Sequence, residues 1–90
     1  MEKISILVPC CNVEAYVREC LDSIQAQTYT NLEIICIDDG SKDSTGTIID
    51  EYVAADKRFK AIHKPNTGYG DSMNKGLECC TGDYIGIIES

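Results

Sequence analysis

Apolar residues along the chain gather in four short runs, and the stretches between them carry apolar residues at helical spacing. The runs predict β-strands at 4–8, 32–37, 59–63 and 84–88. The second run is almost continuously apolar, which is typical of a strand covered on both faces by helices. The third run is shorter, more polar and flanked by lysines, so we expect it at a sheet edge. The fourth has the composition of a buried strand.

Three helices are predicted between these strands. The first covers 13–27, with Asn12 as its N-cap and a single apolar stripe formed by Val13, Tyr16, Val17, Cys20, Leu21 and Ile24. The second covers 44–55, and its inner face consists of Ile48, Ile49, Tyr52 and Val53. The third covers 72–80 after a loop at 65–70, with Gly82 as its C-terminal cap and an inner face of Met73, Leu77 and Cys80.

This alternation of strands and helices is typical of an α/β fold. Each connection is long enough for a right-handed crossover between parallel strands. We therefore expect a single domain, residues 1–90, with a three-layer, doubly wound (Rossmann-like) and mostly parallel sheet in the strand order 3-2-1-4. The third helix then carries the chain back across the first strand. That reversal places a topological switch point between strands one and four.

Polar clusters follow the predicted strands at 9–12, 38–41, 65–70 and 89–90. In the second of these, Gly40 permits a tight turn with positive φ. Because the carboxyl ends of parallel strands meet at one edge of a sheet, we expect the four clusters to lie close together. The sequence therefore predicts a binding site at this edge.

Charge narrows the class of ligand. The net charge is −7 and the isoelectric point is about 4.4, which argues against a nucleic acid or an anionic membrane as partner. An anionic ligand would need a metal ion or backbone N–H donors. The first apolar run is too short for a signal peptide, and no run reaches the length of a membrane span. We expect a cytoplasmic location.

Six cysteines in 90 residues invite a disulfide interpretation. Two adjacent pairs, at 10–11 and 79–80, have neither metal-binding nor redox C-x-x-C spacing. Cys20 and Cys36 fall in apolar patterns, where a free thiol packs as a small hydrophobe. We therefore expect reduced thiols, with a structural zinc site as the less favoured alternative.

The acidic pair after the second strand is the main candidate for chemistry. Neighbouring residues of a strand point to opposite sides, so Asp38 and Asp39 are not expected to act as an acid/base pair on one substrate. One is expected to reach the crevice while the other anchors the loop; a pair that only stabilises the turn remains open. The single histidine, His63, is expected to be a solvated edge residue. Neither a G-x-G-x-x-G nor a GKS/GKT phosphate loop is present.

Three motifs in order carry a family resemblance: V-P-x-x-N at 8–12, D-D-G-S-x-D-x-T at 38–45 and T-G-D-Y-I at 81–85. With them the chain resembles the amino-terminal half of family 2 glycosyltransferases of the GT-A fold. The resemblance implies an enzyme that transfers a sugar from a nucleotide-diphospho-sugar to a glycan, a lipid or a bacterial cell-surface polysaccharide. It also implies an inverting reaction and a Mg²⁺ or Mn²⁺ ion, with the full-length enzyme in the cytoplasm or at the cytoplasmic face of a membrane.

The resemblance also assigns residues. The nucleotide-sugar site would be formed by Pro9, Cys10, Cys11, Asn12, Glu14, Asp38, Asp39, Gly40, Ser41 and Asn74, and the metal would be held by Glu89. Within this set Asp39 would bond the base or ribose, and Asn74 would face the diphosphate. Cys11 and Met73 depart from the pattern, which often has Tyr and Arg there. Residues 89–90 fall inside the family's metal motif, so no catalytic base, bound metal or turnover is expected from these 90 residues.

The alternative is a non-enzymatic doubly wound signalling or interaction module. A receiver-like domain would place its acidic pair after the first strand and its phosphoacceptor after the third. Here the acidic pair follows the second strand and the third ends at His63 and Lys64, which argues against it. Because strand 84–88 would be an apolar edge, a homo-oligomer is expected in either case.

Overall fold

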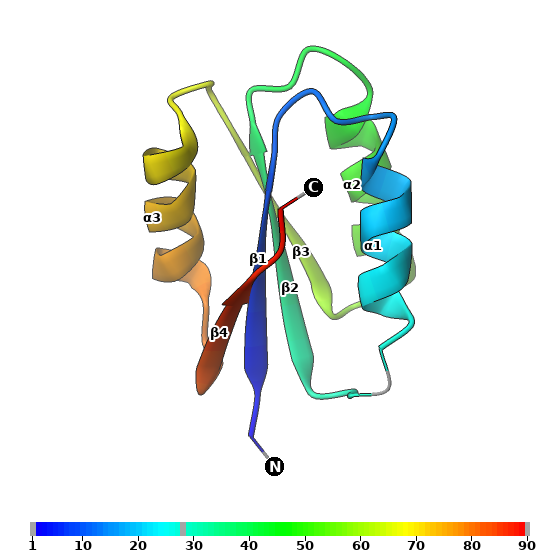
Figure 1. Ribbon diagram of the computed structural model, residues 1–90, viewed down its shortest axis with the longest axis vertical. Coiled ribbons are helices and arrows are strands. Elements are labelled where there is room, and N and C mark those ends of the chain that lie inside the picture. The colour runs from blue at the N-terminus through cyan, green and yellow to red at the C-terminus, as the bar shows by residue number, and fades with distance from the viewer. Residues whose placement is uncertain (1, 28, 90) are drawn as a thin grey trace.

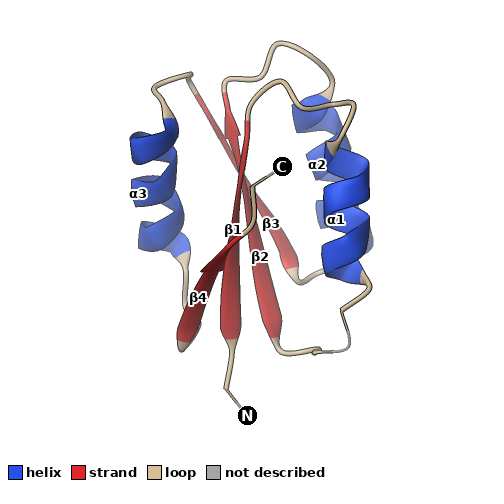
Figure 2. Ribbon diagram, viewed as in Figure 1, coloured by secondary structure: helices blue, strands red, loops and turns tan. Residues whose placement is uncertain are grey.

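In the part of the chain that the structure describes, four parallel strands form the sheet, and three helices cover its two faces (Figure 1). The computed structural model describes residues 2–27 and 29–89. The elements, shown in Figure 2, are β1 (Ile4–Cys10), α1 (Val17–Gln25), β2 (Leu32–Asp39), α2 (Thr45–Ala55), β3 (Phe59–Lys64), α3 (Tyr69–Cys79) and β4 (Tyr84–Ile87). The strand order is β3-β2-β1-β4, which confirms the predicted topology and the edge position of β3.

β2 lies at the centre of the core, and all eight of its residues are buried. Ile34 and Cys36 pack in the cluster shared with α1 and α2, whereas Ile35 and Ile37 pack in the cluster on the α3 side. A continuous apolar run is what a strand with two covered faces requires. Gly76 lets α3 approach closely, because a Cβ there would lie 3.1 Å from the Ile37 side chain.

The first helix is shorter than predicted because Asn12 is not its N-cap. Asn12 adopts a positive φ of 52°, and its Oδ1 accepts a hydrogen bond from the Lys42 backbone N–H at 2.7 Å. The side chain thus bonds the neighbouring loop instead of a helix end. Turns follow at 14–16, and α1 begins at Val17 with Tyr16 in the N-cap position.

The third helix begins earlier than predicted, at Tyr69, and its inner face differs. Its buried residues are Ser72 and Gly76, while Leu77 is 48% exposed, so the prediction of Leu77 as inward was wrong. Gly82 does not cap the helix, which ends at an extended Cys80. Instead, the Gly82 N–H donates to Ser5 Oγ at 2.8 Å, tying the chain to β1.

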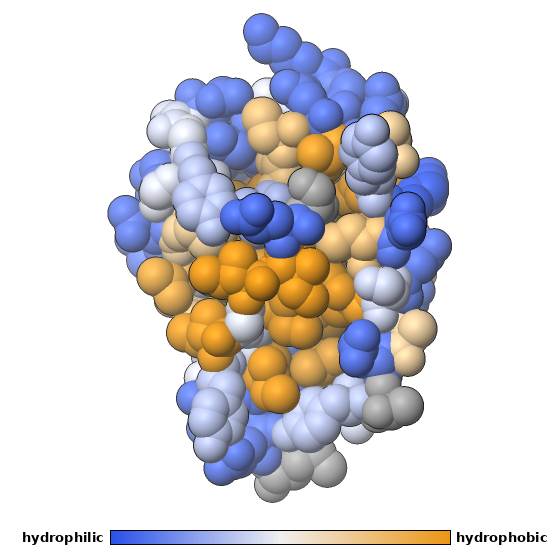
Figure 3. Space-filling model, viewed as in Figure 1, coloured by the Kyte–Doolittle hydropathy of each residue, from blue (hydrophilic) through white to orange (hydrophobic). Residues whose placement is uncertain are grey.

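β4 occupies the predicted edge but is not buried. Tyr84, Ile85, Ile87 and Ile88 are between 39% and 56% exposed. The reason is topological, since β4 pairs with β1 on one side only. Figure 3 shows the resulting hydrophobic surface as an orange area where β4 and β1 face the viewer.

No disulfide bond joins the cysteines within the described residues. Burial raises the pKa of the Cys36 thiol, so this group is a neutral hydrophobe in the core. No group of three or more His, Cys, Asp or Glu side chains among the described residues is arranged to hold a metal ion. In the same part of the chain, no helix is both long and apolar enough to cross a membrane.

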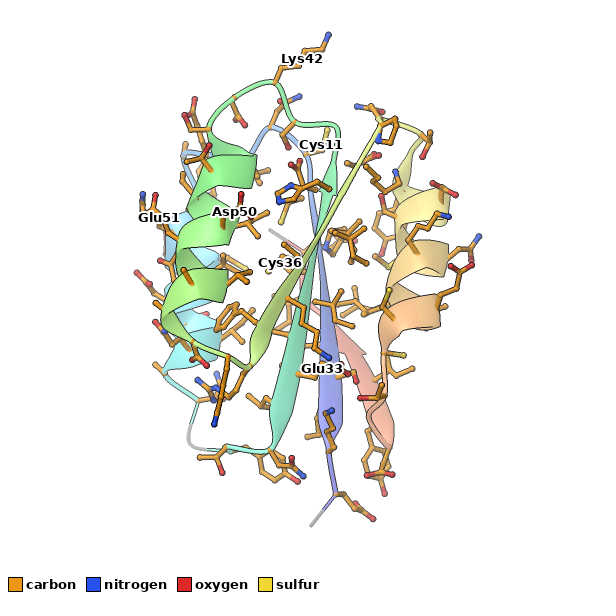
Figure 4. The ribbon with its side chains drawn as sticks, turned by 180° about the vertical axis from the view of Figure 1, so that it is seen from behind. Cys11, Glu33, Cys36, Lys42, Asp50 and Glu51 are labelled. Carbon is orange, nitrogen blue, oxygen red and sulfur yellow. The ribbon has the colours of Figure 1, made fainter. Side chains whose placement is uncertain are left out.

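A buried carboxylate, Glu33 on β2, links that strand to β1, to β3 and to the segment before β4 at the amino end of the sheet (Figure 4). It accepts hydrogen bonds from Ser5 Oγ on β1 at 2.7 Å and from the Thr81 backbone N–H before β4 at 2.8 Å, and it pairs with Lys60 on β3. Burial raises the pKa of Glu33, and the bonds from Lys60, Thr81 and Ser5 outweigh it and hold the pKa at about 2. Sequence reasoning missed this residue, although a charge inside an apolar run was a visible signal.

We expect Glu33→Gln to lower the free energy of unfolding by about 2 kcal/mol, because it removes charge-assisted bonds at a buried site. For a chain of this size that corresponds to a melting temperature about 10 °C lower. The matched control is Glu51→Gln, since Glu51 pairs with Arg18 and both side chains are 53% exposed. The control should cost under about 0.5 kcal/mol. Equal losses in thermal melts of the two variants would contradict a special role for Glu33.

Candidate functional site

The loops after β1 and β2 are joined by hydrogen bonds at the carboxyl edge of the sheet, seen at the top of Figure 1. The Asn12 N–H donates to Ser41 Oγ at 3.1 Å, and the Val13 N–H donates to Thr45 Oγ1 at 2.9 Å. Glu14 Oε2 accepts from the Ser44 N–H at 3.3 Å. These bonds use polar side chains on both sides, so each loop fixes the other.

A cleft of about 310 Å³ lies beside these loops. Its lining residues come from β1 and its loop, the end of β2, the first turn of α3 and the segment after β4: Pro9, Cys10, Cys11, Val13, Asp39, Tyr69, Ser72 and Glu89. Each of the four predicted polar clusters therefore contributes to the cleft, the one at 65–70 through Tyr69. The end of β3 contributes through Lys64, which binds Asp39.

Asp39 faces the cleft and also holds the loop before α3. Its Oδ1 accepts from the Thr67 N–H at 2.9 Å, and its Oδ2 accepts from the Gly68 N–H at 3.2 Å. The ion pair with Lys64, followed by the Thr67 bond, lowers the pKa of Asp39. Asp39 is therefore an ionised acceptor. The prediction that one aspartate reaches the crevice is confirmed for Asp39, which in addition anchors the loop before α3.

Asp38 points to the opposite face, as the strand pleat predicts. Its Oδ1 accepts from the Ser41 N–H at 3.0 Å, and its Oδ2 lies 2.9 Å from His63 Nδ1. Asp38 thus shapes the loop after β2 without lining the cleft.

His63 is exposed on the edge strand β3, as the sequence suggested, but its ring also contacts two carboxylates. Its Nε2 lies 2.8 Å from Asp50 Oδ1 on α2, so both ring nitrogens contact carboxylates. Figure 4 shows Asp50 on the side of α2 toward β3 and Glu51 on the other side. A neutral imidazole has one N–H donor, so two carboxylate acceptors favour the doubly protonated cation. Accordingly, the bond to Asp38, and then that to Asp50, raises the pKa of His63.

The remaining predicted residues fall at different distances from the cleft. Cys11 is exposed at its mouth, with Sγ 3.4 Å from the Asp39 carbonyl oxygen and 3.5 Å from Asn66 Nδ2. Gly40, with φ of 63°, has no room for a side chain, because a Cβ would lie 2.5 Å from the Asn66 backbone nitrogen. Asn74 is exposed on α3 and is not among the cleft-lining residues.

Three lining residues were missed by sequence reasoning: Val13, Tyr69 and Ser72. Val13 was assigned to the apolar stripe of a helix, and Tyr69 to a loop. The one sequence feature that could have indicated a binding role for Tyr69 is its position between two glycines, in the stretch 68–70. Its hydroxyl is close to Glu89, and burial together with this carboxylate raises the pKa of Tyr69.

A divalent cation needs several oxygen ligands, and Mg²⁺ or Mn²⁺ would draw them from carboxylates here. The cleft contains Glu89 and Asp39, but Asp39 is already paired with Lys64. Within residues 2–27 and 29–89 no cluster of three suitable side chains exists. The described residues therefore supply one suitable ligand, Glu89, and do not by themselves fit a cation.

Comparison with known proteins gives consistent matches. The model of the family "Glycosyl transferase family 2" matches residues 5–90. EpsH of Bacillus subtilis is 46% identical over 97% of this chain, glycosyltransferase GlyA of Streptococcus pneumoniae 43% over 99%, and chondroitin synthase of Escherichia coli 38% over 97%. The chain spans 25%, 13% and 13% of the length of these relatives.

Solved structures match over nearly the whole chain. The mannosyltransferase PcManGT of Pyrobaculum calidifontis, in complex with GDP-Man and Mn²⁺, superposes with a TM-score of 0.90 at 22% identity, covering 98% of this chain and 27% of that one. Staphylococcus aureus TarS 1–349, in complex with UDP, superposes with a TM-score of 0.89 at 28% identity. This match covers 98% of this chain and 27% of that one. The fold is thus that of GT-A glycosyltransferases.

The His63 contacts generate a pH prediction. His63 is the single histidine of the chain, so its ring signals in an NMR titration are unambiguous, and we expect them to titrate above the ordinary value of 6.5. Because the folded pKa is raised, the stabilisation from these contacts is complete below about pH 6.5 and is lost as the pH rises through the folded pKa.

Asp50→Asn should move the His63 pKa back toward 6.5, because one carboxylate partner is neutralised. Glu51→Gln is the matched control, since it removes a charge from the next residue of α2 without touching His63. A wild-type titration at or below 6.5 would show that the two carboxylate contacts do not persist in solution.

Proposed function

The chain belongs to glycosyl transferase family 2, and from this membership we propose that residues 1–90 form the donor-nucleotide-binding part of a sugar-transferring enzyme. The full enzyme would transfer a sugar from a nucleotide-diphospho-sugar to an acceptor. The observation that carries the proposal is the cleft beside Pro9, Cys11 and Asp39, at the carboxyl edge of the sheet. Ligands of doubly wound proteins bind at this edge, next to a topological switch point.

The cleft has the size and chemistry for a nucleoside. A volume of about 310 Å³ is at the lower end of the range for small-molecule sites. The ionised Asp39 accepts hydrogen bonds, so it suits the N–H of a base or the hydroxyl of a ribose. Pro9, Cys10 and Cys11 supply the less polar wall. The family resemblance assigns the same roles to these residues.

Other residues support the cleft indirectly. Asn12 and Ser41 join the two loops, and Asp38 and Gly40 fix the turn after β2. Glu14 accepts a bond from the first residue before α2. We assign these residues a positioning role. Asn74 near the diphosphate remains a prediction from the resemblance.

The metal and the reaction belong to the full enzyme. We propose that Glu89 provides one carboxylate ligand to a Mg²⁺ or Mn²⁺ ion, which when bound neutralises the diphosphate leaving group. Inversion at the anomeric centre is proposed from the resemblance alone. PcManGT and TarS were solved with a nucleotide or nucleotide-sugar, and PcManGT with Mn²⁺, which supports the donor class.

The acceptor is proposed to be a glycan, a lipid or a bacterial cell-surface polysaccharide, which the likeness to a chondroitin synthase supports. We place the enzyme in the cytoplasm, at the membrane face if the full-length protein is anchored there. The thiols of the chain agree with a reducing compartment.

Nucleotide binding tests this function. Isothermal titration of the 90-residue chain with UDP and GDP should detect weak binding of at least one, changed less than about threefold by Mn²⁺, because the described cation ligands are incomplete. Asp39→Asn should weaken binding about tenfold, by removing a charged acceptor.

The matched control is Asp83→Asn. Asp83 accepts a bond from the Lys3 N–H at the opposite edge of the sheet, so this change should leave nucleotide affinity unaltered. Absence of binding for both nucleotides would refute the proposed function. A strong dependence on Mn²⁺ would show that the cation site is complete within the chain.

Self-association is proposed for the 90-residue chain, with the exposed strand β4 at the contact. Tyr84, Ile85, Ile87 and Ile88 form an apolar edge of the kind that pairs with another strand. The net charge of −7 opposes association, but at 0.15 M salt the Debye length is only about 8 Å, so contact burial should prevail.

Light scattering at micromolar concentration should therefore give a mass above the 9.9 kDa of one chain. Ile87→Lys should restore the monomer by placing a charge on the apolar edge. Ala54→Lys adds the same charge on the exposed side of α2 and should leave the oligomer intact. A wild-type monomer would mean that the β4 edge does not pair.

A further inference from the structure

Ser72 is one of the residues that line the cleft, and its buried hydroxyl has no hydrogen-bond partner among the described residues. Ser72 is 1% exposed, and its Oγ is fully buried. The residue belongs to the first turn of α3, and its backbone N–H donates to the Gly68 carbonyl at 3.1 Å. The residue lines the same cleft as Pro9 and Asp39.

A buried polar group without a partner is costly, because folding removes its bonds to water without replacing them. Other hydroxyls near the site are satisfied: Thr45 Oγ1 accepts from the Val13 N–H, and Thr67 Oγ1 donates to Asp71 at 2.6 Å. Native proteins leave few such groups, and each calls for an explanation, such as a functional role or a bound water or ion. The position of Ser72, one helical turn after the segment that binds Asp39, supports a functional role.

We propose that Ser72 is a ligand-binding residue that contacts the nucleoside part of the donor. This inference rests on the proposed function and names a contact within it. The lining residues include two acids, Asp39 and Glu89, and no lysine or arginine, so the cleft wall is unsuited to a bare diphosphate. A neutral hydroxyl beside Pro9 and Val13 suits the uncharged half of a nucleotide. A serine side chain has three staggered rotamers, which lets the hydroxyl turn toward a bound ring or sugar.

The test compares wild type with Ser72→Ala by calorimetric titration with UMP and UDP, and by thermal melting without ligand. We expect the variant to bind both nucleotides about 3- to 10-fold more weakly, by the same factor, since they share the nucleoside. The free variant should melt a few degrees higher, because an unsatisfied hydroxyl is removed and alanine favours helix. Weaker nucleotide binding together with a higher melting temperature distinguishes a ligand contact from a hydrogen bond that stabilises the protein itself.

Ser23→Ala is the matched control. Ser23 is an exposed serine on α1 whose Oγ donates to the Cys20 carbonyl at 3.0 Å, and it does not line the nucleotide cleft. This variant should bind UMP and UDP as the wild type does. Its result shows whether removal of any helical serine hydroxyl alters binding.

Each contrary result has its own meaning. Wild-type affinity in Ser72→Ala would overturn the inference and leave the proposed function standing. A loss for UDP but not for UMP would place the contact at the diphosphate and overturn the nucleoside assignment. A lower melting temperature would show that the hydroxyl is satisfied within the protein, which also overturns it. If wild type bound neither nucleotide, the proposed function and this inference would fail together.

Discussion

The alternation of side chains along β2 governs the arrangement of the charged groups in this protein. Successive residues of a strand point to opposite faces, and β2 is covered on both. Glu33 and Asp39 therefore share the α3 face with Ile35 and Ile37, while Asp38 shares the other with Cys36. A shift of one residue in the register of β2 would exchange the partners of all three acids and move Asp39 out of the cleft.

Because the chain has more acidic than basic side chains, few basic side chains remain available to bind a phosphate at the cleft. Several basic side chains are already paired: Lys60 with Glu33, Lys64 with Asp39, Arg58 with Asp56 and Arg18 with Glu51. Lys64 thus neutralises an acid of the cleft itself and is not available to a phosphate. A diphosphate placed beside Glu89 would meet a like charge, so its binding depends on a cation or on further ligands. For this reason we assign the cleft to the nucleoside half of the proposed donor.

The sequence was sufficient to predict the strand order, because the pattern of apolar residues by itself indicates which strands are buried. The continuous apolar run of β2, the polar edge strand β3 and the long crossovers led to the correct strand order. Prediction from the sequence failed where a side chain can bond either to neighbouring residues or to residues far away in the sequence. Asn12 has good capping chemistry but bonds Lys42. His63 is exposed on the edge strand as predicted, but its contacts with Asp38 and Asp50 were not foreseen. The apolar composition of β4 indicated burial, whereas exposure depends on which strands lie beside it.

The position of the cleft follows from topology more than from any motif. β1 is central, so its carboxyl end lies between the loop after β2 and the segment after β4. The Ile88 N–H donates to the Leu7 carbonyl at 3.0 Å, which extends the pairing beyond β4 and brings Glu89 next to Pro9 across 80 residues of sequence. α3 connects the opposite edge of the sheet to β4 and forms the remaining wall. The reversal of strand order therefore determines where the cavity lies, whereas the side chains that line it set its chemistry.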